Sequence, residues 1–228
     1  MLQKTLDKAQ EGVKLNDLDC YADELIREKG AESSFKKVNG YKWTLCFSVN
    51  DVVVHGIPTN YILKKEDLIG IDCGVYYRGF HTDSAYTKII PGGDNHKLYN
   101  FVSTGKEALK KAIAQVKISN YIYDISLAIQ QIIQKHGFSV VRNLVGHGIG
   151  RKLHEDPEVP GFVSRGRIKT PQIVEGLVIA IEVIYNMGGN EVVCKGNDGW
   201  TIATKDGKIS GLFEATVAAT SRGCIILT

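Results

Sequence analysis

Residues 144–157, with the sequence LVGHGIGRKLHEDP, are the stretch from which the fold and the site can be worked out. His147 is flanked in the sequence by two glycines, so backbone and solvent can approach its side chain closely. His154 follows seven residues later, within a charged segment. A histidine that ends a strand and enters a glycine-rich loop is a common arrangement for a metal ligand, but a lone histidine is more often structural or exposed. The role of His147 therefore depends on the ligands that the rest of the chain supplies.

The composition excludes several classes of protein. The 228 residues suffice for one large domain or two small ones with a sizeable apolar core. The net charge of +3 comes without a long basic run, which argues against nucleic acid as the main partner. No apolar run approaches the roughly 18 residues of a membrane span, and the polar first ten residues do not resemble a signal peptide.

The cysteines indicate a reducing compartment. Their number is odd and no CxxC pair occurs, so the sequence predicts neither a disulfide framework nor a thiolate zinc site. We therefore expect a cytoplasmic protein. The five cysteines are Cys20, Cys46, Cys73, Cys194 and Cys224.

Two aspartates stand in an expected hairpin. Residues 67–77 are typical of a buried strand with Asp72 in its middle, and residues 80–90 return as its partner with Asp83, eleven residues after Asp72. An ionised carboxylate in a buried strand is costly unless it is paired or bound to metal. Two on neighbouring strands repel each other, so a cation between them would stabilise both. The alternative is that one or both face solvent.

Two glutamates interrupt apolar strands in the second half of the chain. Residues 177–185 predict a strand that is apolar on both faces except at Glu182, and residues 210–220 predict a last strand interrupted by Glu214. A fully apolar strand with one acid is hard to explain as a solvated face. Each half of the chain therefore offers a pair of acids carried by strands.

The other expected elements surround these strands. Strands are expected at 41–50 and at 52–54, residues 139–141 lead towards the His147 segment, and the stretch 155–172 is loop-like. The second of these strands ends at His55, which taken alone is most simply a turn residue. Amphipathic helices are expected from an Asn16 cap to Gly30, over 95–116, and from an Asp124 cap to Gly137.

Four oxygen donors and one nitrogen donor make a plausible metal site. This set suits divalent ions of intermediate hardness such as Mn, Fe, Co or Zn. Four negative charges exceed what one divalent ion needs, so two ions bridged by carboxylates fit better, as in two-metal hydrolases. His55 and His154 remain to hold a substrate or a developing oxyanion. The candidate ligands are Asp72, Asp83, His147, Glu182 and Glu214.

Several short motifs, in this order and spacing, resemble one family. The chain is similar to the type I methionine aminopeptidases from about residue 16 to residue 220. Any one of these motifs alone would be weak. They are CFSVN at 46–50, HGIP at 55–58, ID at 71–72, HTD at 81–83, GHGIG at 146–150, HE at 154–155, IE at 181–182, DGWT at 198–201 and FE at 213–214.

The resemblance implies an α+β "pita-bread" fold over residues 1–228 as a single catalytic metallopeptidase domain. It has two pseudo-symmetric halves, a curved antiparallel sheet and helices on the outer side. The implied activity is removal of the initiator methionine from the N-termini of nascent polypeptides, with a small second residue preferred. We expect a monomer that acts without nucleic acid or membrane, and the sequence leaves contact with the ribosome open.

The resemblance also implies roles for single residues. The five candidate ligands would hold two divalent ions, with Asp83 and Glu214 bridging them and the substrate's free α-amino group bound beside them. Glu182 would also be the general acid and base for the attacking water. His154 would face the substrate carbonyl oxygen, and His55 the scissile amide nitrogen. The methionine side chain would lie in a pocket bordered by Tyr41, Cys46 and Trp200.

Some positions depart from the family pattern. Ala215 stands where histidine is usual, which predicts weaker support around the metal site. Leu153 replaces an aromatic residue, which predicts a wider or differently shaped pocket, and residues 42–44 replace a proline-bearing segment at its rim. The family's first helix is expected to be shortened or missing. The 35 residues from His147 to Glu182 leave no room for the helical insert of type II enzymes.

Two other functions compete with this interpretation. Prolidases and Xaa-Pro aminopeptidases share the fold and the ligand set, but they usually carry an extra N-terminal domain and lack the pattern of residues 46–58. A peptide-binding module without catalysis is the second alternative, although such proteins typically lose metal ligands and all five are present here. Chelation separates the two classes, because an enzyme would stop whereas a binder would not need the ions.

Overall fold

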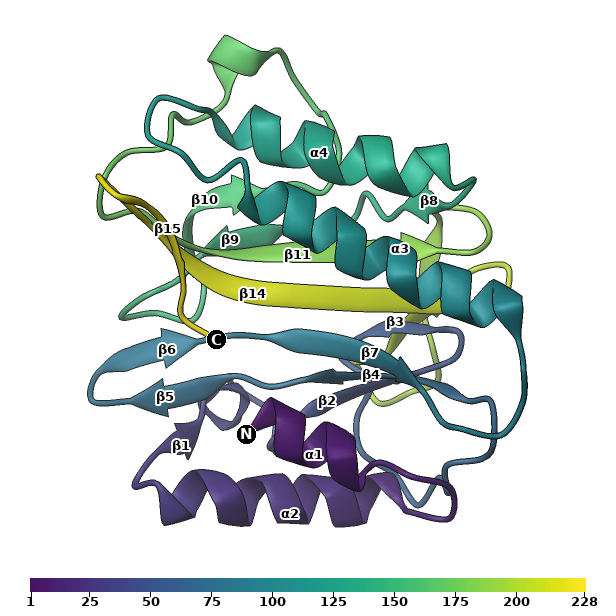
Figure 1. The fold of residues 1–228 in the computed structure, drawn as a ribbon. Helices are drawn as coiled ribbons and strands as arrows, with labels where there is room; N and C mark the ends of the chain where they lie inside the picture. The colour runs from purple at the N-terminus through teal and green to yellow at the C-terminus, as the bar shows by residue number, and fades with distance from the viewer.

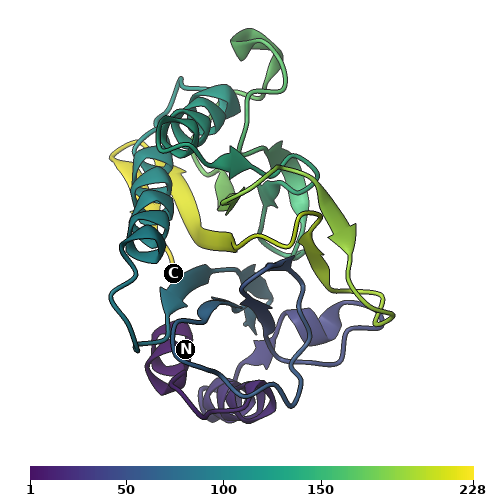
Figure 2. The same cartoon turned by 90° about the vertical axis from the view of Figure 1, so that its right-hand side faces the viewer.

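The computed structural model describes all residues 1–228 and divides into two halves, each with an antiparallel sheet and outer helices. Turned by 90°, the N-terminal half lies below the C-terminal half (Figure 2). The helices are α1 (Leu2–Lys8), α2 (Leu15–Glu28), α3 (His96–Ile113) and α4 (Ile122–Lys135), with 3-10 turns at Phe35–Lys37 and Arg167–Lys169.

The N-terminal half has a sheet β2-β4-β7 and a smaller sheet β1-β5-β6, with α1 and α2 on the outside (Figure 1). Its own core contains Leu15 and Leu18 from α2 with Phe47, Ile69 and Ile71 from the strands. The strands are β1 (Glu32–Ser33), β2 (Cys46–Val49), β3 (Val52–Val54), β4 (Leu68–Asp72), β5 (Val75–Tyr77), β6 (Phe80–Thr82) and β7 (Ala85–Ile89).

The C-terminal half is built on the sheet β10-β9-β11-β14-β15, to which β8 adds along β11, while β12-β13-β3 links the halves. Helices α3 and α4 pack on this sheet over the largest apolar cluster of the protein (Figure 1). The strands are β8 (Ser139–Val140), β9 (Gly146–Gly148), β10 (Glu155–Val159), β11 (Val178–Asn186), β12 (Val192–Cys194), β13 (Ile202–Thr204), β14 (Ser210–Thr220) and β15 (Gly223–Ile226).

Two buried threonines join the halves where β7 contacts β14. The Thr87 hydroxyl donates to the Leu212 carbonyl at 2.7 Å and accepts the Leu212 N–H at 3.0 Å. The Thr216 hydroxyl likewise donates to the Asp83 carbonyl at 2.7 Å and accepts its N–H at 2.9 Å. Because these bonds satisfy buried backbone groups, they fix Asp83 beside the strand that carries Glu214.

The predicted helices are present, but their caps differ. Helix α2 begins at Leu15 after Lys14, so Asn16 is not its cap. The α3 cap is Asn95, whose side chain accepts the Leu98 N–H. Asp124 lies inside the first turn of α4 and accepts the Tyr121 N–H at 2.8 Å, so it satisfies a free donor of that helix from within rather than from the cap position.

The strand predictions need corrections. The expected strand 41–50 is β2 alone, and the strand expected over 67–77 breaks after Asp72 into β4 and β5. The prediction of a loop over 155–172 is wrong for β10, which lies at the edge of its sheet and so tolerates Pro157. Strand β15 was not predicted. A helix is present near the start as the seven-residue α1.

Two expectations from composition can be compared with the structure. All five cysteines are free in the structure. None of the helices combines the length and the apolar character that crossing a lipid bilayer requires.

Candidate active site

Four acidic side chains meet where the two halves join. Asp72 ends β4, and Asp83 lies between β6 and β7. In the other half, Glu182 of β11 is directly opposite Glu214 of β14 in the antiparallel ladder. Directly opposed side chains lie on one face of a sheet, so the two glutamates lie side by side. The structure therefore brings together the acids that the sequence placed in separate halves.

His147 joins this group from β9. Its Nδ1 lies 2.8 Å from the carbonyl oxygen of Gly148, to which it donates as Nδ1–H, and this tautomer leaves a lone pair on Nε2. Donor atoms of His147, Asp83 and Glu214 lie within 4.8 Å of one another. The nitrogen of the His147 ring that is not available to a metal therefore bonds to a backbone carbonyl, a group that commonly orients a metal-binding histidine.

Burial dominates the protonation of the site. It raises the pKa of Asp83 to about 7 and that of Glu182 to about 8, the latter also because of the Asp83 charge. Burial, with the neighbouring carboxylates, raises the pKa of Asp72 and of Glu214 well above the ordinary range. Burial lowers the pKa of His147 to about 4, so the neutral ring 3.7 Å from Glu182 Oε1 does not form an ion pair with it near pH 7.

The donor set fits bound cations. Buried polar atoms normally have a hydrogen-bond partner, but Asp72 Oδ1 and Glu214 Oε1 have none. No lysine or arginine lines the pocket around them. Carboxylate oxygens with one imidazole nitrogen suit divalent ions of intermediate hardness. Cations at this place would satisfy both oxygens and offset the repulsion between the carboxylates, so the residues present fit the metal that the sequence predicts.

Every residue that the sequence proposed for the site lines one pocket of about 140 Å³. The acids and His147 form its polar side, while the opposite wall is mainly apolar. The Tyr41 ring meets the Trp200 ring edge-on at 5.1 Å between centroids and the Trp43 ring at 5.2 Å. The wall consists of Phe35, Val38, Tyr41, Cys46, Val54, Leu153 and Trp200.

The pocket adjoins a larger, more open groove. His55 and His154 line both cavities, as do Val54, His147 and Glu182. The His154 ring lies 4.5 Å from the His147 ring, edge to face. Burial lowers the pKa of His55 and of His154, so both rings are neutral near pH 7 and each can donate one N–H and accept at its other nitrogen.

The sequence missed three residues of the wall. Val54 directly precedes His55 at the end of a predicted strand, so its position gave a usable signal. Phe35 and Val38 are apolar residues in a stretch that otherwise reads as a polar loop. An aromatic residue isolated in such a loop indicates that the loop folds against something, and here it folds against the pocket.

The departures from the family pattern lie at different distances from the acids. Leu153 is part of the pocket wall, and Trp43 packs on Tyr41 from outside it. Ala215 belongs to the apolar cluster beneath α3 and α4, because adjacent residues of a strand point to opposite faces and Glu214 faces the pocket. Weaker support of the metal site from the missing histidine stays a prediction.

Comparisons with known proteins agree with this geometry. The family model of metallopeptidase family M24 matches residues 1–221. A methionine aminopeptidase of Clostridium perfringens is 45% identical over 97% of this chain and 88% of its own length. The structure of methionine aminopeptidase from Thermotoga maritima superposes with a TM-score of 0.95 at 35% identity, over 100% of this chain and 90% of that one.

The fold itself is shared more widely. Prolidase from Pyrococcus furiosus superposes with a TM-score of 0.74 at 21% identity, over 98% of this chain but only 58% of that one. At this identity the likeness concerns the fold alone. The predicted pita-bread fold and the predicted family are both confirmed. The chain belongs to metallopeptidase family M24, in its methionine aminopeptidase branch.

Proposed function

We propose that the protein hydrolyses the first peptide bond of polypeptides that begin with methionine. The observation that carries the proposal is one pocket in which unsatisfied buried carboxylates face an apolar wall. The carboxylates suit cations that bind an N-terminal amine, and the wall suits an unbranched apolar side chain. The similarity to methionine aminopeptidases supports the same activity. The substrates would be nascent polypeptides in the cytoplasm, met by a monomeric enzyme with one catalytic domain.

The five candidate ligands would hold two divalent cations, of Co, Mn, Fe or Zn. When bound, the cations supply Lewis-acid chemistry and make a nucleophile available near neutral pH. Asp83 and Glu214 are proposed to bridge them, since both belong to the group of donor atoms within 4.8 Å that includes His147. Asp72 and Glu182 would complete the set, one from each half.

Glu182 is proposed as the general acid and base. Its carboxyl group is buried in the pocket, and burial with the Asp83 charge raises its pKa to about 8 in the protein without cations. Nearby cations would lower this pKa towards neutrality, where one group can take a proton from water and return it to the leaving amine. His147 keeps its Nε2 available as a ligand because Nδ1–H donates to Gly148.

His55 and His154 are proposed to hold the reacting bond. Both rings are neutral near pH 7 and border the pocket and the outer groove, where the bond after the first residue would lie. His154 would donate to the carbonyl oxygen as negative charge develops there, and His55 would contact the amide nitrogen. A large second side chain would meet these two rings, so the proposal includes a preference for small second residues.

The test is release of free amino acid from defined peptides. The protein is stripped of metal, reloaded with Mn, Co or Fe, and incubated with Met-Ala-Ser, Met-Phe-Ser and a Xaa-Pro-Ala tripeptide. The proposal expects methionine from Met-Ala-Ser, much less from Met-Phe-Ser, and no activity after chelation.

Two outcomes would contradict the proposal. Release from the Xaa-Pro peptide alone would assign the protein to the proline-directed peptidases that share its fold. No release from any peptide by a protein that contains two metal ions would favour a peptide-binding module without catalysis. Metal content is therefore measured on the same samples.

A further inference from the structure

The segment from Tyr41 to Cys46 forms one side of the proposed methionine pocket, and only its last residue belongs to a strand. The Tyr41 hydroxyl donates to the Leu45 carbonyl at 2.8 Å and lies 3.1 Å from Cys46 Sγ. The position of the Tyr41 ring therefore depends on where the backbone at Leu45 lies.

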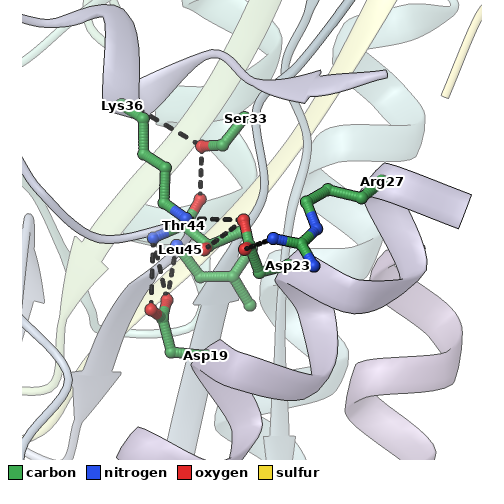
Figure 3. A network of polar contacts seen from close by, with 7 residues as sticks. All are labelled: Asp19, Asp23, Arg27, Ser33, Lys36, Thr44 and Leu45. Carbon is green, nitrogen blue, oxygen red and sulfur yellow. Dashed lines mark hydrogen bonds and ion pairs between the residues drawn. The ribbon is translucent and has the colours of Figure 1, made fainter. Parts of the chain in front are cut away.

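Helix α2 fixes that backbone through one side chain, as Figure 3 shows. Asp19 Oδ1 accepts the Thr44 N–H at 3.0 Å and the Leu45 N–H at 2.9 Å. Asp19 Oδ2 also lies 3.3 Å from the Thr44 nitrogen. Thr44 and Leu45 are both fully buried, so water cannot replace these acceptors.

Asp19 reaches the segment from the inner side of α2. It lies four residues after Leu15 and three before Ala22, both buried, and such spacing places all three on one face of the helix. Burial raises the pKa of Asp19, and the two N–H donors lower it. An acid on the apolar face of a helix needs partners of this kind to be tolerated.

Two further hydrogen bonds hold Thr44, but through its hydroxyl and its carbonyl group rather than its N–H. The Thr44 hydroxyl donates to Asp23 Oδ1 at 3.2 Å, and the Ser33 hydroxyl donates to the Thr44 carbonyl at 2.8 Å. Asp23 in turn pairs with Lys36 and, at 3.9 Å, with Arg27 (Figure 3). Neither Asp23 nor Ser33 forms a hydrogen bond with Leu45, so from α2 the backbone next to Cys46 is held by Asp19.

We propose that Asp19 is a positioning residue that sets the side of the methionine pocket formed by Tyr41 and Cys46. The inference rests on the proposed function for the identity of the side chain that the pocket receives. Asp19 does not line the pocket, and its effect is transmitted through the Leu45 backbone to the Tyr41 ring. Substrate binding should therefore depend on Asp19 more than the chemical step does.

The test compares Asp19→Asn with Asp17→Asn, which makes the same chemical change at an exposed position of the same helix. Asparagine keeps one acceptor oxygen, but its amide group is itself a donor and would face a backbone donor. For Met-Ala-Ser we expect KM to rise about tenfold in Asp19→Asn, with kcat within about twofold of wild type, because binding rather than transition-state contacts is lost. Asp17→Asn should behave as wild type, and metal content should be equal in all three proteins.

Two further measurements keep the test independent of activity and of folding. Amide hydrogen exchange at Thr44 and Leu45 should be slow in wild type and Asp17→Asn and faster in Asp19→Asn. Asp19→Glu restores both oxygens one methylene further out and should give a KM between those of wild type and Asp19→Asn. If Asp19→Asn does not fold, Asp19→Glu carries the comparison.

Unchanged KM and unchanged exchange in Asp19→Asn would overturn the inference. So would a loss confined to kcat with less metal bound, because that would place the effect at the acids and not at the pocket wall. A wild-type protein that releases no methionine would instead contradict the proposed function, and the exchange rates would still test whether Asp19 fixes this segment.

Discussion

Two groups of acids in this protein lie among apolar residues, and they differ in what surrounds their oxygens. The helix acids, Asp19 and Asp23 of α2, accept hydrogen bonds from backbone N–H groups, a hydroxyl and an ammonium group. The sheet acids face one another, and two of their buried oxygens have no partner. They are Asp72, Asp83, Glu182 and Glu214. Burial alone therefore does not identify a candidate metal ligand, whereas buried carboxylate oxygens that lack donors and line a pocket with further carboxylates do.

The protonation of the two groups follows the same difference. Nearby carboxylates raise the pKa of Asp72, Glu182 and Glu214 in addition to the effect of burial, whereas burial alone raises that of Asp83. For Asp19, burial raises the pKa by more than the two N–H donors lower it. For Asp23, partial burial raises the pKa, but Lys36 and the Thr44 hydroxyl lower it by more. The sheet acids gain from a cation and the helix acids do not.

The largest effect should come from removing the proposed general acid and base of the sheet group. Glu182→Ala should lower kcat for Met-Ala-Ser by about 10³-fold, because it removes the proposed proton transfer as well as one proposed metal ligand. Metal content measured on the same protein shows how much of the loss comes from ligation. Glu191→Ala is the control, since Glu191 is exposed and paired only with Lys205. Full activity in Glu182→Ala would contradict the mechanism.

The stability of the metal-free protein should fall as pH rises from 6.5 to 8.5. The folded pKa values of Asp83 and Glu182 are raised to about 7 and about 8, whereas carboxyl groups of the unfolded chain titrate near ~4. In this window the folded state keeps protons that the unfolded state has released, so raising the pH favours unfolding. His147, with its folded pKa lowered to about 4, still binds part of a proton in the unfolded chain near pH 6.5, so it opposes the fall only at the lower end of this window.

The measurement for this pH effect is a series of thermal unfolding curves of chelated protein. We expect Tm to fall by roughly 5 °C between the two pH values, and added Mn or Co to restore it at the higher pH. A Tm that is constant or rises over this window, with chelator present, would show that the sheet acids are not held protonated in the folded protein.

Replacing an acid by its amide should change the free energy of unfolding of the metal-free protein in opposite directions in the two groups. Glu214→Gln should raise the free energy of unfolding by about 1 kcal/mol at pH 8, because the variant neither carries a buried charge nor needs a proton there. Asp19→Asn should lower it by about 1–3 kcal/mol, because a buried N–H loses its acceptor. Denaturant unfolding of both variants with chelator tests this. A loss of stability in Glu214→Gln equal to that in Asp19→Asn would remove the distinction between the groups.

The sequence predicted the sheet acids because each breaks a simple pattern. A lone acid in an apolar strand, as at Glu182 and Glu214, has few structural explanations, and the hairpin spacing brought Asp72 near Asp83. The ladder between β11 and β14 then placed the two glutamates opposite each other, which no local pattern could establish. Nor could the sequence show that the two halves are joined by Thr87 and Thr216, since these contacts span 125 and 133 residues.

The helix acids were not predicted as functional, although a signal was present. The apolar residues Leu15, Leu18, Ala22 and Ile26 define the buried face of α2, and Asp19 falls within that face at helical spacing. Its partners lie 25 and 26 residues further on in a segment that was expected to be a strand. An acid on the predicted apolar face of a helix therefore indicates that another segment supplies N–H donors to it, but the sequence does not tell which segment.

The smallest effect should come from the outer helix acid. Asp23 is about a quarter exposed, and its bonds to Lys36 and the Thr44 hydroxyl leave the Leu45 backbone untouched. Asp23→Asn should lower Tm by only about 2 °C, because partly exposed ion pairs contribute about 1 kcal/mol or less. KM for Met-Ala-Ser should stay within twofold of wild type. If Asp23→Asn raised KM as much as Asp19→Asn, the pocket wall would depend on the whole network around Thr44 and not on the two backbone hydrogen bonds that Asp19 accepts.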